Sequence, residues 1–237
     1  MRIDQQPSFI LHARPYRETS LLLEAFTRDH GRIGLVARGV RRERSRLPRG
    51  LLQPLQPLLL DWVQRGELGT LVGADAAGAP LPLAGGALMP ALYANELVLR
   101  LSGRGDPHAG GFAAYAQCLA RLAWDEDAAW TLRRFERDFL ADLGYALALL
   151  RCMDGVPVED GVDYAYDPAE GPRPWRAEGP ALRISGGALR ALALDLQPSP
   201  SQLAELRRMM RATVRHLVGG ELNAWKMGTG MPADPRR

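Results

Sequence analysis

The chain has 237 residues, of which 46% are hydrophobic and 24% are charged, a composition typical of folded soluble proteins. It is long enough for two domains, because single domains commonly contain about 100–150 residues. No run approaches the roughly 18 apolar residues that a membrane helix requires, and the first residues lack an apolar run of signal-peptide length. We therefore expect a cytoplasmic protein that is not bound to a membrane.

The net charge of +3 is unevenly distributed along the chain. Residues 1–80 contain twelve arginines and eight acidic residues, whereas the remainder contains 18 basic and 19 acidic residues. The positive balance therefore belongs to the N-terminal third, and this favours a polyanionic partner for that part of the chain.

Five short segments of the first 80 residues have the pattern of β-strands and follow one another at a spacing of roughly ten residues. They are residues 9–14, 20–27, 32–38, 55–63 and 67–74. We expect Pro15 to close the first strand, because proline cannot donate to a ladder, and Gly31 to allow the hairpin turn that follows the second. A sheet this small is best protected by closure, so the pattern predicts a five-stranded β-barrel of the oligonucleotide-binding (OB) type.

A domain boundary is expected at residues 75–90, which are small, rich in proline and glycine and almost uncharged. We predict an α+β chain with an N-terminal five-stranded OB-fold β-barrel at residues 1–80, followed by a mostly α-helical domain at residues 81–237. Within the second domain, residues 152–185 are expected to be irregular, with a single weak strand pattern at residues 162–166.

Apolar residues spaced three and four apart predict the helices of the second domain. The predicted helices cover residues 91–101, 112–124, 128–150 and 186–196, followed by one long final helix. Ser199, Pro200 and Gln202 form the signature of a capping box at its start, and Gly219 marks its end. On that helix Arg207, Arg211 and Arg215 recur every four residues beside Arg208, either to contact DNA or to pair with acids of a neighbouring helix.

The segment at residues 38–49, RGVRRERSRLPR, contains six arginines and only one acid, Glu43. Guanidinium groups bind phosphate in a bidentate fashion, and each neutralised phosphate releases a counterion. We therefore predict that this segment contacts a phosphate backbone; the alternative is a solvated loop without a partner. Phe9, Tyr16 and Phe26 could stack on unpaired bases, although aromatic residues in strands more often belong to the core.

The sequence does not indicate catalytic chemistry. The four histidines are scattered, and the motifs of zinc hydrolases, serine hydrolases and phosphate-binding loops are missing. Cys118 and Cys152 are far apart and form neither a disulfide framework nor a metal motif. We expect no catalytic residue, metal or cofactor. An enzyme that uses one of the two thiols or a pair of carboxylates is the alternative, and replacement of both cysteines by alanine would test its thiol version.

Several segments resemble the bacterial RecO recombination mediators. The first runs Phe9-Ile-Leu-His-Ala-Arg-Pro-Tyr-Arg-Glu-Thr-Ser-Leu-Leu-Leu and continues through Phe26-Thr27 to Gly31-Arg-Ile-Gly-Leu-Val-Ala-Arg-Gly39. Three more follow in order: Leu51-Leu-Gln-Pro-Leu-Gln-Pro-Leu, Tyr93-Ala-Asn-Glu-Leu97, and Leu132-Arg-Arg-Phe-Glu136 continuing to Leu143-Gly-Tyr145. The resemblance covers most of the chain and implies an OB-fold followed by a helical domain.

The resemblance also implies a role in DNA repair and recombination. A protein of this kind binds and anneals single-stranded DNA, also contacts double-stranded DNA, and works with the partner RecR. It helps RecA, indirectly, to displace the single-stranded-DNA-binding protein (SSB), whose acidic C-terminal tail it binds. Such a protein would be cytoplasmic and associated with the nucleoid. An OB-type module for structured RNA is the alternative, because no residue of the sequence identifies a reader of the ribose 2′-hydroxyl.

Many members of this family contain a four-cysteine zinc site in the helical domain. At the corresponding place this chain reads Cys152-Met-Asp-Gly155, and no further cysteine follows. We therefore expect no zinc ion, and hydrogen bonds and packing must hold residues 152–185.

Two sets of site residues follow from the basic pattern and the resemblance. The predicted DNA-binding residues are Arg14, Arg32, Arg38, Arg41, Arg42, Arg44 and Arg46. The predicted residues for the SSB tail, which ends in acids and a terminal phenylalanine, are Arg133 and Arg134, because the tail needs a guanidinium beside an apolar slot. The alternative is that both arginines pair with Glu136 and other acids of the same helix.

Overall fold

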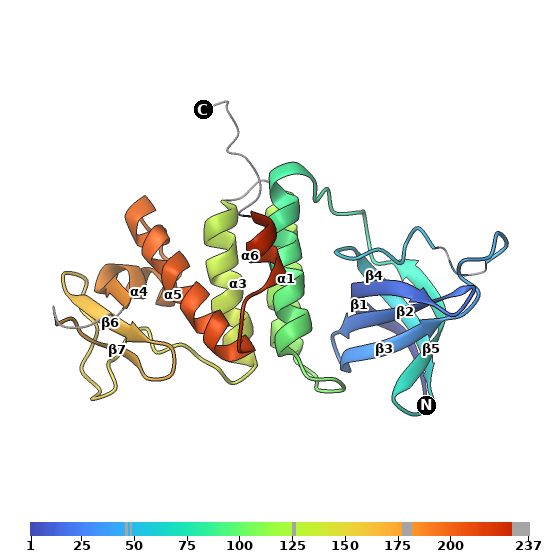
Figure 1. Ribbon diagram of the computed structural model, residues 1–237, viewed down its shortest axis with the longest axis horizontal. Coiled ribbons are helices and arrows are strands. Elements are labelled where there is room, and N and C mark those ends of the chain that lie inside the picture. The colour runs from blue at the N-terminus through green and yellow to red at the C-terminus, as the bar shows by residue number, and fades with distance from the viewer. Residues whose placement is uncertain (46, 48, 125–126, 177–181, 229–237) are drawn as a thin grey trace.

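The computed structural model describes residues 1–45, 47, 49–124, 127–176 and 182–228. A β-barrel lies at one end of an elongated molecule, a group of helices lies in the middle, and a small sheet lies at the other end (Figure 1). Three clusters of buried apolar side chains form the core, one inside the barrel, one between barrel and helices, and one between the helices and the small sheet.

The barrel has five strands, which are β1 (Arg2–Tyr16), β2 (Ser20–Thr27), β3 (Gly31–Ala37), β4 (Pro57–Gln64) and β5 (Leu68–Ala76). Their order around the closed barrel is β1-β2-β3-β5-β4, with β3 and β5 parallel and the other pairs antiparallel. Leu23, Leu35 and Leu60 point inward and are completely buried, as the alternation of residues along a half-buried strand requires. The prediction of a five-stranded OB barrel is confirmed.

The first strand is longer than predicted. It continues through Pro15, which lies opposite Leu21 at the end of the ladder, where a missing N–H group costs little. Its first half pairs with β4 through a bulge between Ile3 and Gln6. Gln5 adopts a positive φ of 51° in this bulge, and its N–H group donates to Asp61 Oδ1. Polar residues at a bulge hide the strand from a search for apolar alternation.

Within the described residues six α-helices follow, preceded by the short 3₁₀ helix η1 (Gly85–Ala87). They are α1 (Leu88–Leu101), α2 (Ala109–Ala123), α3 (Ala128–Asp142), α4 (Gly186–Ala193), α5 (Pro200–Val218) and α6 (Asn223–Gly228). The capping box of α5 is present, and Gly219 ends this helix in the left-handed conformation. No helix within the described ranges has the length and apolarity to cross a membrane.

Helix α3 ends at Asp142, earlier than the predicted residue 150. Gly144 adopts a φ of +86°, and the N–H group of Tyr145 donates to the carbonyl oxygen of Leu140 at 2.8 Å. This is a Schellman ending, which turns the chain out of the helix although apolar residues continue at helical spacing. Leu147 and Leu149 instead pack into the third core cluster.

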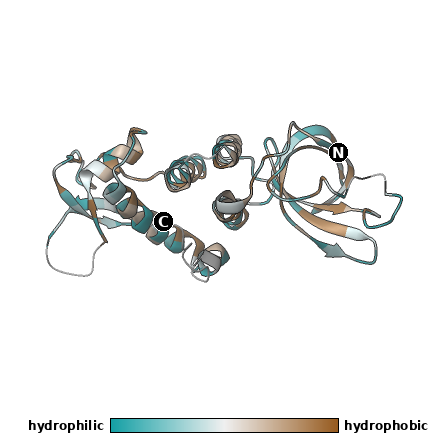
Figure 2. Ribbon diagram, turned by 90° about the horizontal axis from the view of Figure 1, so that it is seen from above, coloured by the Kyte–Doolittle hydropathy of each residue, from teal (hydrophilic) through white to brown (hydrophobic). Residues whose placement is uncertain are grey.

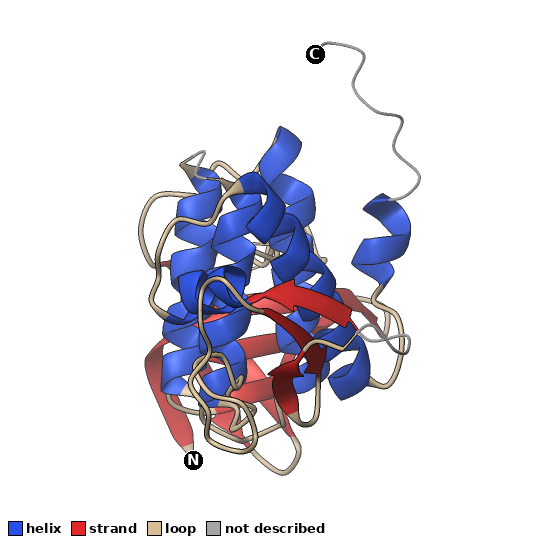
Figure 3. Ribbon diagram, turned by 90° about the vertical axis from the view of Figure 1, so that its left-hand side faces the viewer, coloured by secondary structure: helices blue, strands red, loops and turns tan. Residues whose placement is uncertain are grey.

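Residues 152–185 are more ordered than predicted, because they contribute a three-stranded antiparallel sheet. Its strands are β6 (Asp163–Asp167), β7 (Gly171–Pro174) and β8 (Leu182–Ser185), in the order β7-β6-β8. Tyr164 and Ile184 are opposite each other and buried against α4 and α5. Figure 3, viewed from this end, shows the sheet in front of the helices. Packing of apolar side chains therefore holds this segment, and only the strand at residues 162–166 was visible in the sequence.

The barrel and the helices share a core. Phe9 and Phe26 of the barrel pack against Phe112 and Tyr115 of α2, with ring centroids between 5.1 and 6.3 Å apart. Asn95 of α1 donates to the carbonyl oxygen of Leu11 at 2.8 Å and accepts from the Tyr115 hydroxyl at 2.9 Å. Seen from above, the helices stand directly against the barrel wall (Figure 2).

Gly31 occupies the tightest point of this junction. It has a φ of +64°, and a Cβ atom at this position would overlap the backbone of Asp106 in the loop between α1 and α2. We expect Gly31→Ala to lower the free energy of unfolding by about 3 kcal/mol, from the left-handed backbone and the overlap together. The matched control is Gly66→Ala, where φ is +85° but no atom is near, and where only about 1 kcal/mol is expected. Urea unfolding of both variants measures the difference, and equal losses would contradict the close contact.

Candidate nucleic-acid interface and partner pocket

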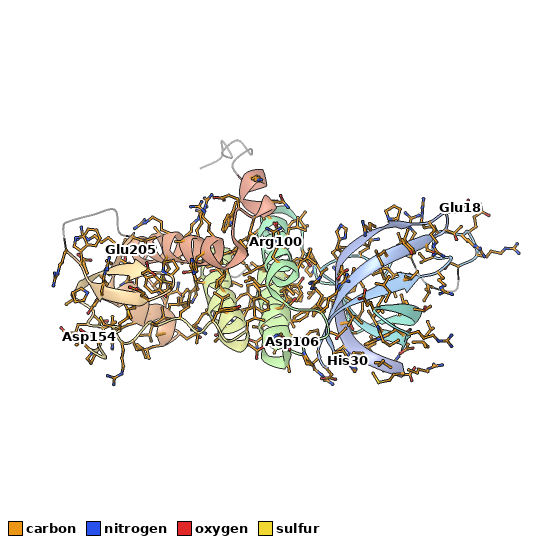
Figure 4. The ribbon with its side chains drawn as sticks, turned by 60° about the horizontal axis from the view of Figure 1, so that its bottom comes forward. Glu18, His30, Arg100, Asp106, Asp154 and Glu205 are labelled. Carbon is orange, nitrogen blue, oxygen red and sulfur yellow. The ribbon has the colours of Figure 1, made fainter. Side chains whose placement is uncertain are left out.

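The arginine-rich loop between β3 and β4 is fixed to the barrel by its apolar residues. Val40, Leu47 and Leu52 are buried in the barrel cluster, and the N–H group of Arg41 donates to the carbonyl oxygen of Thr19 in the turn between β1 and β2 at 2.9 Å. The loop lies at the outer end of the barrel, away from the helices (Figure 1). Glu18, in the adjoining turn, is at the same end in Figure 4.

The guanidinium groups at this end of the barrel are exposed. Arg14 lies opposite Leu22, which lies opposite Val36, so these three side chains form a row on the outer surface of the barrel. Arg38, Arg41, Arg42 and Arg44 are exposed beside this row. Across the described ranges, none of these arginines donates to an acidic side chain. Arg46 belongs to the predicted set but lies outside the described residues. We call Arg14, Arg38, Arg41, Arg42 and Arg44 the basic end of the barrel.

Arg32 does not belong to this surface, contrary to the prediction. Its Nη1 atom donates to Glu24 Oε2 at 3.0 Å, its Nε atom donates to the carbonyl oxygen of Ser102 at 3.1 Å, and the side chain is largely covered. Glu24 also accepts from Arg104 of the loop between α1 and α2. Strand β3 begins beside the helices and ends at the outer end of the barrel. Arg32, near its start, therefore joins barrel and helices, whereas Arg38, directly after its end, lies at the basic end.

Phe9 and Phe26 are not available for stacking on bases. Both side chains are buried in the core that the barrel shares with α2, with 3% and 0% of their surface exposed. Tyr16 is partly exposed, and the guanidinium of Arg17 lies 5.3 Å from its ring centroid. Of the three aromatic candidates, only Tyr16 remains next to the basic end.

A cavity of about 510 Å³ opens on the helical part of the molecule. Four helices line it: α1 contributes Met89, Pro90 and Tyr93, α3 contributes Leu132 and Arg133, α5 contributes Leu203, Arg207 and Arg211, and α6 contributes Trp225. The wall is mainly apolar, and the described residues that line it include no acidic side chain. This combination of an apolar slot with three guanidinium groups suits a ligand that joins an apolar side chain to a carboxylate. We call it the helical pocket.

Arg133 lies in the wall of the helical pocket, whereas Arg134 does not. The Arg133 Nη2 atom donates to Glu136 Oε1 at 2.6 Å, so the alternative pairing with Glu136 is present for this arginine, and its role in binding a tail stays a prediction. The Arg134 guanidinium lies 5.6 Å from the ring centroid of Trp130. Sequence reasoning missed Arg207 and Arg211 as pocket residues, because α5 reaches α1 and α3 only through the tertiary fold. The four-residue arginine spacing on α5 was the available signal.

Two arginines of the series on α5 share one acidic partner. Arg211 and Arg215 both donate to Glu221, and the Arg211 guanidinium lies 4.9 Å from the ring centroid of Trp225. Arg211 lines the helical pocket, whereas Arg215 does not. Glu221 lies in the loop between α5 and α6, so the acid is not on a neighbouring helix as expected, and contact of this series with DNA stays untested.

Both cysteines are buried and unpaired with each other. Burial raises the pKa of the Cys118 thiol well above its usual range, and the nearby charge of Glu136 adds to the shift. Burial, assisted by Asp154, also raises the pKa of Cys152. A nucleophilic thiol requires the opposite shift, so neither environment activates a cysteine. Across the described residues no three histidine, cysteine or acidic side chains gather to hold a metal ion.

The barrel order, the helical region behind it and the basic end together define the class of an OB-fold protein with a helical C-terminal part. Family models give the particular family: "Recombination protein O N terminal" matches residues 1–79, and "Recombination protein O C terminal" matches residues 84–226. The chain belongs to the RecO family.

Curated relatives with the name "DNA repair protein RecO" are similar over nearly the full length. The protein of Stenotrophomonas maltophilia (strain K279a) is 43% identical over 231 residues, covering 96% of this chain and 97% of the relative. That of Ralstonia nicotianae is 43% identical over 231 residues, covering 94% and 82%. That of Xanthomonas oryzae pv. oryzae (strain PXO99A) is 42% identical over 232 residues, covering 96% and 97%.

Proposed function

We propose that this protein is a non-catalytic mediator of DNA repair and homologous recombination in the cytoplasm, associated with the nucleoid. It binds and anneals single-stranded DNA, also contacts double-stranded DNA, and with RecR helps to load RecA onto SSB-coated DNA. The observation that carries the proposal is the basic end of the barrel, where exposed arginines without acidic partners gather on an OB fold. Membership of the RecO family supports the same role.

The proposed mechanism requires no covalent step. Guanidinium groups of the basic end neutralise phosphates of two strands, lower the repulsion between them and leave the bases free to pair. The helical pocket holds the C-terminal tail of SSB, whose terminal phenylalanine fills the slot beside Leu132 and Leu203. Arg133, Arg207 and Arg211 donate hydrogen bonds to the carboxylates of the tail.

Annealing of complementary strands coated with SSB tests the proposal as a whole. The protein should accelerate annealing on SSB-coated strands, and removal of the SSB tail should abolish the acceleration. On bare strands, which carry no SSB, the protein should accelerate annealing as well. Failure to accelerate annealing on bare strands would refute the annealing function, and indifference to the tail would refute the proposed docking.

A filled pocket should prevent tail binding. Ala204 is exposed in the wall of the helical pocket, so we expect Ala204→Trp to weaken binding of a peptide ending in phenylalanine by at least about tenfold, because the indole occupies the slot. The matched control, Ala141→Trp, places the same side chain on exposed helix α3 outside the pocket. Fluorescence anisotropy of the labelled peptide measures both, and equal affinities for the two variants would place the tail elsewhere.

A further inference from the structure

A buried group of three polar side chains lies behind the wall of the helical pocket. Glu136 has no exposed surface, and Tyr93 and Arg133 are 7% and 6% exposed. The Tyr93 hydroxyl and the Arg133 Nη2 atom both donate to the same oxygen of Glu136, Oε1. Tyr93 and Arg133 line the pocket, whereas Glu136 does not. A ligand would therefore meet the guanidinium without touching the carboxylate that offsets its charge.

The hydrogen bonds of this group are incomplete. In the described part of the chain, Glu136 Oε2 and Arg133 Nε are buried without a hydrogen-bond partner. An unpaired buried polar atom is costly, and an ion pair replaced by apolar side chains is often as stable, so stability alone does not account for the pair. The pair lies at the wall of a cavity, where Arg133 lines the space and Glu136 lies behind it.

We infer that Glu136 determines how strongly the helical pocket favours a carboxylate, an inference that rests on the proposed function of the pocket. The Glu136 charge offsets that of Arg133, so a carboxylate gains directed hydrogen bonds from Arg133 but little net attraction to it. The apolar side chain in the slot then supplies most of the affinity, and isolated acidic groups are poorly held. The pocket thus selects an acid joined to an apolar residue over acids in general.

The ionisation of Glu136 fits this role. Burial raises its pKa, while the charge of Arg133 and the hydrogen bond from Tyr93 oppose the rise. The titratable groups around it are Arg133 on its own helix, Tyr93 from α1 and Cys118 from α2. Since the pKa of Glu136 lies above that of an exposed glutamate, falling pH protonates it early and exposes the full charge of Arg133 to the pocket.

The test replaces Glu136 by glutamine, which keeps the shape and accepts the same hydrogen bonds but carries no charge. The probes are one peptide ending in phenylalanine with a free carboxylate, the same peptide as its C-terminal amide, and the free acid ending in alanine. We expect Glu136→Gln to raise the acid-to-amide affinity ratio about tenfold and to leave the phenylalanine-to-alanine ratio unchanged. An unchanged or smaller acid-to-amide ratio would overturn the inference.

A pH series on the unaltered protein covers the case in which Glu136→Gln does not fold. The terminal carboxylate of the peptide stays ionised well below neutral pH, and no histidine lines the pocket, so the acid-to-amide ratio should rise as the pH falls. A ratio independent of pH would count against Glu136. Absence of peptide binding to the unaltered protein would instead refute the proposed function of the pocket.

Discussion

Replacing Arg41, Arg42 and Arg44 together by alanine is expected to weaken binding of single-stranded DNA about fiftyfold at about 0.15 M salt. Each lost phosphate contact removes roughly 0.7 from the slope of log K against log salt for a single strand, so three contacts lower it by about 2. The reason is that these guanidinium groups are exposed and free of acidic partners within the described ranges. Fluorescence anisotropy titrations over a salt series measure both quantities.

The matched control removes three arginines from the opposite end of the barrel. Arg2, Arg28 and Arg65 are exposed there, and the first two pair with Asp4 and Asp29. If binding depended on net charge alone, both triple variants would lose the same affinity. An unchanged slope in the Arg41, Arg42 and Arg44 variant would remove the basic end from the proposal. Competition by RNA of the same sequence with equal affinity would favour the RNA-binding alternative.

Truncation of Phe26 should have the largest effect on stability. Its side chain is completely buried between the barrel and α2, so Phe26→Ala is expected to cost about 3–5 kcal/mol of unfolding free energy. Phe26→Leu keeps most of the volume and should cost only about 1 kcal/mol. Because the ring joins two parts of the chain, the alanine variant should also separate the unfolding of barrel and helices into two transitions.

Urea unfolding followed by circular dichroism at a helical wavelength and by tryptophan fluorescence distinguishes these outcomes, provided that the other four tryptophans are replaced by phenylalanine, so that only Trp62 in the barrel core reports. Two coincident transitions in Phe26→Ala would contradict the shared core. A loss of DNA affinity in Phe26→Leu, without loss of stability, would indicate that the Phe26 ring contacts bases despite its burial.

The sequence predicted the parts of the fold that depend on local chemistry. Alternating apolar residues such as Leu21 and Leu23 identified barrel strands, and Ser199 with Gln202 identified the start of α5 correctly. The pattern does not predict the strand through Gln5, because a bulge breaks the alternation. It predicts too long a helix α3, because Gly144 ends the helix although the apolar pattern continues. Local pattern alone does not determine where such an element stops.

The candidate site was less accessible to sequence reasoning, because charge does not reveal partners. Arg14 and Arg32 look equivalent in the sequence, yet one is exposed and the other joins Glu24 to the α1–α2 loop. The resemblance points to Arg133, but it does not show that the buried partner of Arg133, Glu136, also accepts a hydrogen bond from Tyr93 of another helix. Pairings between distant segments of the chain become visible only when the helices are packed.

The aromatic junction between barrel and helices has a consequence for how a partner is used. Since Phe9, Phe26, Phe112 and Tyr115 pack the two parts together, the helical pocket and the basic end are separated by a fixed span of protein. Under the proposed function, a protein bound by its tail in the pocket is tethered, and the DNA it carries would reach the barrel at an effective concentration set by the length of the linker between tail and DNA-binding part. A linker longer than the distance between the helical pocket and the basic end should slow annealing gradually. A linker too short to cover that distance should stop it.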